Sequence, residues 1–196
     1  ELHTRSMREH ILLLAPRRVG KTSLLHKLKA EVDSEHGMGA VYVSVQGATH
    51  ELDFLRSIHE AAAAHPTARG LSTVGKRIRK ILSPVREVAF AGFGMKLDAT
   101  NPDRWQERAR ELADELTRLP GHWFLLVDEL PVFVARLLRD DQTTQRARAF
   151  LEWFRAVRQK KPGEDVTLHW ILAGSIGLDV IAHRHRLSDT VNDLRS

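Results

Sequence analysis

The sequence predicts an α/β fold with a parallel sheet, and three observations point to it. Apolar stretches of strand length alternate with segments whose apolar residues recur at helical spacing. The first strand leads into a short loop that ends in Gly20-Lys21-Thr22, and a helical pattern follows directly. A later apolar strand ends in two carboxylates, Asp128 and Glu129. Strands that alternate with helices favour a parallel sheet with helices on both faces.

Two strands and two helices are predicted in the first third of the chain. His10–Leu14 and Ala40–Val45 are apolar runs of strand length. The helix after the loop is indicated by apolar residues at helical spacing, namely Leu24, Leu25, Leu28 and Val32. The next helix is indicated by Leu52, Leu55, Ile58 and Ala61. Thr49 precedes it and is the candidate N-terminal cap.

The middle of the chain interrupts the alternation. Leu71, Val74, Ile78 and Ile81 recur at helical spacing. Val85–Leu97 then alternates apolar and polar residues near its end, which predicts a β-hairpin inserted on the core around residues 84–98. A further helix is expected to begin at Asn101-Pro102, a cap followed by proline, and to stop at Pro120-Gly121.

The last third returns to strands and helices. Trp123–Val127 and Thr167–Ala173 are apolar enough for buried strands. Between them a helix that ends before Pro162-Gly163 is indicated by Ala147, Phe150, Leu151, Phe154 and Val157. The whole pattern predicts one α/β core over residues 1–196.

The loop between the first strand and the first helix reads A-P-R-R-V-G-K-T from Ala15 to Thr22. A strand, a loop ending in Gly-Lys-Thr and a helix together form the phosphate-binding P-loop, whose backbone N–H groups surround a polyphosphate. Lys21 is expected to reach the β- and γ-phosphates, and the Thr22 hydroxyl to bind magnesium. Ala15 stands where the strict pattern has glycine. The predicted nucleotide-binding residues are Ala15, Pro16, Arg17, Arg18, Val19, Gly20, Lys21, Thr22 and Ser23.

Two further strand ends carry polar residues suited to phosphate chemistry. Asp128 ends an apolar strand and is placed to hold magnesium, while Glu129 could polarise a water for attack on the γ-phosphate. The alternative is an ordinary strand that leads into a charged loop. Ser175 follows Ile171–Gly174, and its hydroxyl would face the γ-phosphate if that strand lies between the other two. Otherwise Ser175 is a turn serine that caps the next helix.

Composition restricts the class of protein and of partner. Hydrophobic residues make up 42% of the 196 residues and charged residues 28%, which is typical of a globular domain. The absence of cysteine excludes disulfides and zinc–thiolate sites. No signal peptide and no apolar run of membrane-spanning length is visible, so we expect a cytoplasmic protein without a membrane partner. The net charge of +5 permits an anionic partner without requiring one.

Four segments together resemble the P-loop ATPases of the AAA+/STAND group, and especially the archaeal-type ATPase family of prokaryotes. They are PRRVGKTSLL (16–25), FLLVDELPVF (124–133), FLEWFRAVRQ (150–159) and ILAGSIGLD (171–179). The resemblance implies a three-layer core of the ASCE/AAA+ type, with a sensor strand between the Walker A and Walker B strands. Lys21 and Thr22 then match Walker A, Asp128 and Glu129 match Walker B, and Ser175 matches sensor 1. Since the family core continues into a further strand and a lid domain, the chain is expected to be an incomplete core.

The motifs predict a regulatory module that binds ATP with Mg²⁺ and hydrolyses it, with ADP as the product and with self-association or a protein effector as expected partnerships. Two alternatives stay open: a DNA-associated ATPase such as a loader, transposition or defence factor, and a nucleotide-binding scaffold without turnover. Candidate arginine fingers are Arg155, Arg158, Arg184 and Arg186. For each of them a solvated helix charge is the alternative. Lys76, Arg77, Arg79 and Lys80 form a basic cluster, but without interleaved aromatic residues a solvated helix face is favoured over nucleic-acid binding.

Overall fold

The computed structural model describes residues 10–16, 18–66, 103–116, 121–141, 143–159, 166–175 and 177–194. Four strands form one parallel sheet: β1 (Ile11–Leu14), β2 (Met38–Ser44), β3 (Gly121–Asp128) and β4 (Val166–Gly174). Their order across the sheet is β1-β4-β3-β2. The predicted parallel α/β fold is therefore confirmed. The last strand lies between the first and the third, as the resemblance implied.

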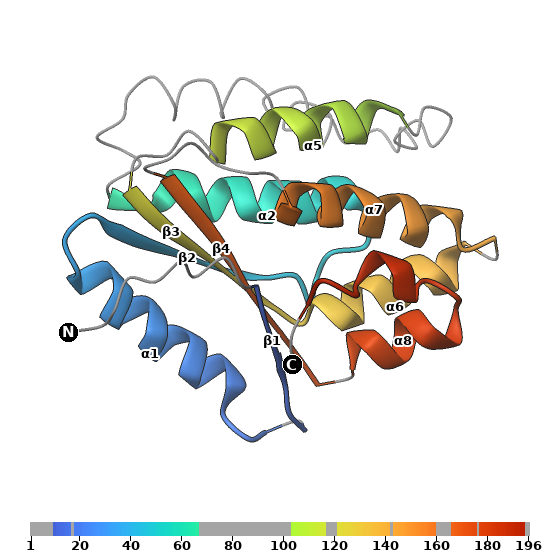
Figure 1. Ribbon diagram of the computed structural model, residues 1–196, viewed down its shortest axis with the longest axis horizontal. Coiled ribbons are helices and arrows are strands. Elements are labelled where there is room, and N and C mark those ends of the chain that lie inside the picture. The colour runs from blue at the N-terminus through green and yellow to red at the C-terminus, as the bar shows by residue number, and fades with distance from the viewer. Residues whose placement is uncertain are drawn as a thin grey trace, which may run out of the picture.

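Helices cover both faces of this sheet (Figure 1). On one face lies α1 (Lys21–Ser34), whose Leu25 and Val32 pack against strand residues such as Leu126 and Ile171. The other face carries α2 (Glu51–Ala64), α6 (Leu130–Asp140), α7 (Gln145–Gln159) and α8 (Leu178–Arg184). Helix α5 (Asp103–Leu116) packs against α2 and α7, and a short 3₁₀ helix spans Ser188–Thr190. The predicted α/β/α layering is thus present.

Helix α2 begins one residue later than its predicted cap would place it. The N-terminal cap is His50, and its N–H donates to the Asp53 carboxylate at 3.1 Å. The N–H and hydroxyl of Thr49 donate to the same oxygen of Asp53, at 3.1 and 2.9 Å. The prediction of Thr49 as the cap is therefore wrong, because the chain supplies a carboxylate that satisfies both residues before the helix.

Two helices lie where the sequence analysis assigned none. Helix α6 starts directly after Glu129 with Pro131 in its first turn, a position where the missing N–H of proline costs nothing. Helix α8 has only seven residues, too few to show helical periodicity. Of the remaining expectations, the helix over 71–81, the hairpin around 84–98 and the basic cluster at Lys76 lie outside the described residues.

Arginines of α7 hold the last described segment of the chain. The Arg158 guanidinium is fully buried, pairs with Asp193 at 2.8 Å and lies 4.6 Å from the centre of the Phe154 ring. Arg148 donates to the Arg186 carbonyl at 2.7 Å, and Arg155 donates to the Asp189 carbonyl. Arg158 is therefore a structural cation, and from this position it cannot reach a neighbouring molecule as an arginine finger. None of the described helices has the length and apolar character that crossing a bilayer requires.

Replacing Asp193 with asparagine is expected to destabilise the fold by about 3 kcal/mol, because it leaves the buried Arg158 cation without its counter-charge. A urea titration of each variant measures this loss. Asp189→Asn is the matched control, since Asp189 is 61% exposed in its pair with Arg148 and its replacement should leave the free energy of unfolding nearly unchanged. Equal losses of stability in the two variants would contradict the role of Asp193 as the counter-charge of the buried Arg158.

Candidate functional site

The carboxyl ends of β1, β3 and β4 meet at one edge of the sheet, and the N-terminus of α1 faces the same edge. Leu14 pairs with Gly174, and Asp128 pairs with Ala173. The Ala15 N–H extends the ladder by donating to the Gly174 carbonyl at 3.5 Å. In open α/β sheets this edge is where ligands bind. The three predicted strand ends therefore lie together.

The loop before α1 turns through a left-handed conformation that suits glycine. Gly20 caps α1 with φ of 89°, and no atom lies within 4 Å of where a Cβ would stand among the described residues. A side chain there would project into this open space above the helix N-terminus. Arg18 also has a positive φ of 66°, which is uncommon for a residue with a Cβ. Among the other predicted loop residues, Arg17 lies outside the described residues, and Pro16, Val19 and Ser23 are exposed.

The Lys21 side chain folds back along the loop. Its ammonium donates to the carbonyls of Ala15 and Pro16, each at 2.7 Å, and the residue is only 8% exposed. An ammonium has three N–H donors, so two of them are used here. This brings a positive charge to the junction of the first strand and the loop, beside the N-terminus of α1, where the helix dipole adds to it.

Thr22 and Asp128, separated by 106 residues in the chain, are in direct contact. The Thr22 hydroxyl donates to Asp128 Oδ2 at 2.6 Å. Asp128 is 3% exposed, and no described donor lies within hydrogen-bonding distance of its other oxygen, Oδ1. A buried carboxylate oxygen without a donor is costly unless a cation or water satisfies it. Thr22 and Asp128 were predicted as the metal-binding pair, and they lie side by side.

Tyr42 is a site residue that the sequence analysis missed. Its hydroxyl donates to Asp128 Oδ2 at 3.2 Å, and its ring centre lies 4.2 Å from that of His26 on α1. An aromatic residue in an apolar strand is usually part of the core, so the sequence alone does not single out Tyr42 as a site residue. Only the register between β2 and β3 reveals the role of Tyr42. Ser44 pairs with Asp128, and Tyr42 lies two residues before Ser44, so Tyr42 is on the same face of the sheet as Asp128.

Burial, the negative charge of Asp128 and the hydrogen bond to that carboxylate raise the pKa of Tyr42 to about 12. Tyr42 is the only tyrosine in the chain, so the ultraviolet absorbance of tyrosinate reports on this residue alone. We expect the folded protein to keep Tyr42 neutral through pH 10 and to ionise it towards pH 12, while the unfolded chain ionises near 10. The folded state therefore loses stability as the pH rises through this window, since the unfolded chain releases the proton first. In Asp128→Asn the midpoint should fall back towards 10, and an unchanged midpoint would refute the contact.

The second acid of the pair contacts the end of β4. The Ser175 hydroxyl donates to Glu129 Oε2 at 3.2 Å. Glu129 caps α6 in the left-handed conformation with φ of 62°, so a non-glycine residue turns sharply between Asp128 and the helix. Of the two open interpretations for Ser175, facing the other strand ends agrees with the observed strand order.

The residues at this edge fit a magnesium ion that arrives with a polyphosphate. Among the described residues, no three His, Asp or Glu side chains gather as a metal cluster. Mg²⁺ in proteins commonly has one or two side-chain ligands and takes its other ligands from phosphate and water. The donor-free oxygen of Asp128 and the Thr22 hydroxyl match that donor set.

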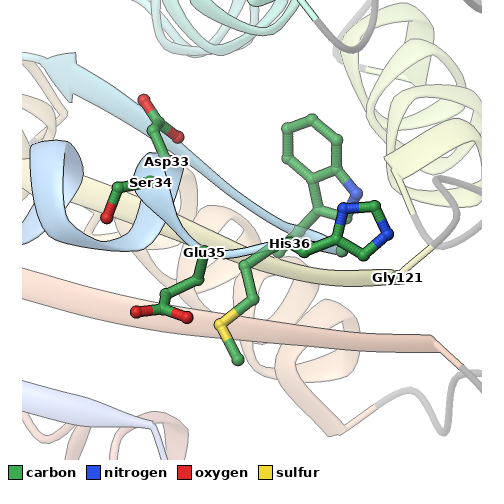
Figure 2. A pocket seen from close by; sticks show the side chains of 8 residues that line it. Asp33, Ser34, Glu35, His36 and Gly121 are labelled. Carbon is green, nitrogen blue, oxygen red and sulfur yellow. The ribbon is translucent and has the colours of Figure 1, made fainter.

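A separate hollow of about 580 Å³ lies at the other end of the strands, where β2 and β3 begin and α1 ends. Figure 2 shows Asp33, Ser34, Glu35 and His36 along its wall, with Gly121 at the start of β3. The Asp33 carboxylate already has three hydrogen-bond partners: Lys29, His65 at 3.0 Å and the Ala40 N–H at 2.8 Å. None of the predicted site residues lines this hollow.

Comparison with known proteins identifies no family: no family model matches the chain, and no curated protein matches it. Among solved structures, the chain is similar to the Orc1 protein of Aeropyrum pernix, determined in complex with DNA. The two are 18% identical, with a TM-score of 0.48 over 93% of this chain and 37% of that one. A likeness this distant does not bear on what the present chain binds.

Proposed function

We propose that this chain binds ATP together with Mg²⁺ at the edge formed by β1, β3, β4 and the N-terminus of α1. One observation carries the proposal: Thr22 of the Gly-Lys-Thr loop donates to the buried Asp128 at 2.6 Å. A chance Gly-Lys-Thr sequence would have no reason to meet a strand-end carboxylate 106 residues away. The buried Lys21 ammonium beside this contact supplies the charge that a triphosphate needs.

Each residue has a distinct part in binding. Lys21 has an N–H left for phosphate oxygens beyond the two that contact the Ala15 and Pro16 carbonyls. The Thr22 hydroxyl has lone pairs free for a cation while its O–H donates a hydrogen bond to Asp128. When bound, Mg²⁺ would neutralise phosphate charge and orient the γ-phosphate.

We further propose that the site hydrolyses ATP. A water oxygen attacks the γ-phosphorus, the bond to the β,γ-bridging oxygen breaks, and ADP leaves with that oxygen. The Glu129 carboxylate accepts the proton of the attacking water. Ser175 orients Glu129, since its hydroxyl donates to one carboxylate oxygen and leaves the other for water. The left-handed turn at Glu129 supports this role because strained backbone gathers at catalytic positions.

The finer assignment is to a regulatory ATPase of the AAA+/STAND type. The position of β4 between β1 and β3 supports it, since Ser175 is thereby held between the loop and the acidic pair. In such a switch, γ-phosphate contacts order the segments around Asp128, Glu129 and Ser175, and hydrolysis releases them.

Titration of the protein with ATP, in Mg²⁺ and in EDTA, together with phosphate release, tests this function. The proposal expects one site per chain, tighter binding in Mg²⁺, and phosphate release that requires Mg²⁺. Binding without release would remove the hydrolytic part and favour the scaffold alternative. A protein that binds no ATP under either condition would refute the proposal as a whole.

A further inference from the structure

Asp128 receives two donors on one oxygen, and they come from different elements. Thr22 of α1 and Tyr42 of β2 both donate to Oδ2, at 2.6 and 3.2 Å. Oδ1 has no donor among the described residues. Two donors on the same oxygen fix the plane of the carboxylate, because turning that plane away from the donors would break both hydrogen bonds. The position of the oxygen that has no donor is thereby fixed as well.

The sheet register and a ring on α1 place the Tyr42 side chain for this contact. Strand register places it opposite Leu126, one diagonal step from Asp128, which is a distance that a tyrosine side chain spans. The His26 ring of α1 contacts the Tyr42 ring, and the two planes are tilted by 38°. The hydroxyl thus reaches Asp128 from a half-buried ring on β2, whereas Thr22 reaches it from α1.

We propose that Tyr42 is a positioning residue that fixes the Asp128 carboxylate for magnesium through the hydrogen bond from its hydroxyl. This inference rests on the proposed function of the site. Groups that hydrogen-bond to a metal ligand set the orientation of that ligand, and their loss commonly weakens metal binding ten- to a hundredfold. Tyr42 does not touch nucleotide in this account, and its effect passes through the Asp128 carboxylate.

Tyr42→Phe tests the inference, because it removes the hydroxyl and keeps the ring against His26. ATP affinity is measured by calorimetry in EDTA and over a series of Mg²⁺ concentrations. We expect the affinity in EDTA to stay unchanged and the Mg²⁺ concentration for half-maximal effect to rise about tenfold. Ser57→Ala is the control: it removes a hydroxyl that bonds to the Asp53 carbonyl of its own helix at 2.9 Å, away from the site.

A second readout uses the wild-type sequence and does not depend on the variant folding. Because Tyr42 is the only tyrosine, 3-fluorotyrosine incorporation gives one fluorine resonance from this position. The resonance should shift when Mg²⁺ is added to the ATP complex.

The outcomes separate this inference from the function on which it rests. An unchanged Mg²⁺ requirement in Tyr42→Phe, or a fluorine resonance that ignores Mg²⁺ while wild-type protein binds Mg·ATP, would overturn the role of Tyr42 and leave the nucleotide site standing. A wild-type protein whose ATP binding does not respond to Mg²⁺ would instead refute the site, and the role of Tyr42 with it.

Discussion

Lys21→Ala is expected to weaken ATP binding about a hundredfold, equivalent to about 3 kcal/mol, and to abolish phosphate release. The lysine is 8% exposed and brings its ammonium to the carbonyls of Ala15 and Pro16 at the start of the loop. Without the ammonium, the triphosphate oxygens would face the Ala15 and Pro16 carbonyl oxygens, whose partial charge is negative like their own. Calorimetric titration of the variant with Mg·ATP measures the loss.

Lys27→Ala is the matched control for this experiment. Lys27 is on the same helix, but its side chain is 74% exposed and pairs with Glu31, at 3.8 Å. Its removal takes away the same formal charge without reaching the loop, so ATP affinity should change by less than about twofold. Equal losses in the two variants would indicate a general charge effect and would contradict the role of Lys21.

Glu129→Gln is expected to lower the rate of phosphate release by about a hundredfold or more while ATP still binds. The amide has nearly the same shape and can still accept a hydrogen bond from the Ser175 hydroxyl, but it cannot take a proton from water. Single-turnover phosphate release and calorimetry on the same sample separate the two effects.

Glu152→Gln provides the matched control, because Glu152 is 57% exposed on α7 and contacts Arg148 at 3.4 Å. It should release phosphate at the wild-type rate. If Glu129→Gln also retains the wild-type rate, Glu129 is not the base, and another group must accept the proton of the attacking water. If Glu129→Gln loses ATP binding, its main part is in holding the site together.

Much of the fold is predictable from the sequence, because its signals are local. All four strands of the sheet lie within a few residues of their predicted positions, since each is a continuous apolar run between polar segments. Helix α6 escaped prediction because Leu130 and Pro131 directly follow the acidic pair, where proline usually indicates a break. Helix α8 was too short for its periodicity to be recognised.

The residues of the candidate site likewise differ in whether the sequence alone could predict them. Thr22 and Asp128 could be paired in advance, because strand-end logic brings any parallel strand ends to one edge. Tyr42 could not, because its contact with Asp128 depends on the β2–β3 register, which no local pattern specifies. For the same reason the partner of Arg158 was invisible: Asp193 is 35 residues further along the chain and meets it only after α7 and the final segment pack.

The central claim is that triphosphate and magnesium share the edge between the Gly-Lys-Thr loop and Asp128. A crystal structure of the chain with Mg²⁺ and a non-hydrolysable ATP analogue tests it most directly. The account predicts phosphate oxygens against the Lys21 ammonium, with the metal beside Thr22 Oγ1 and Asp128 Oδ1. Nucleotide bound elsewhere, for example in the hollow between Asp33 and Trp123, would contradict it.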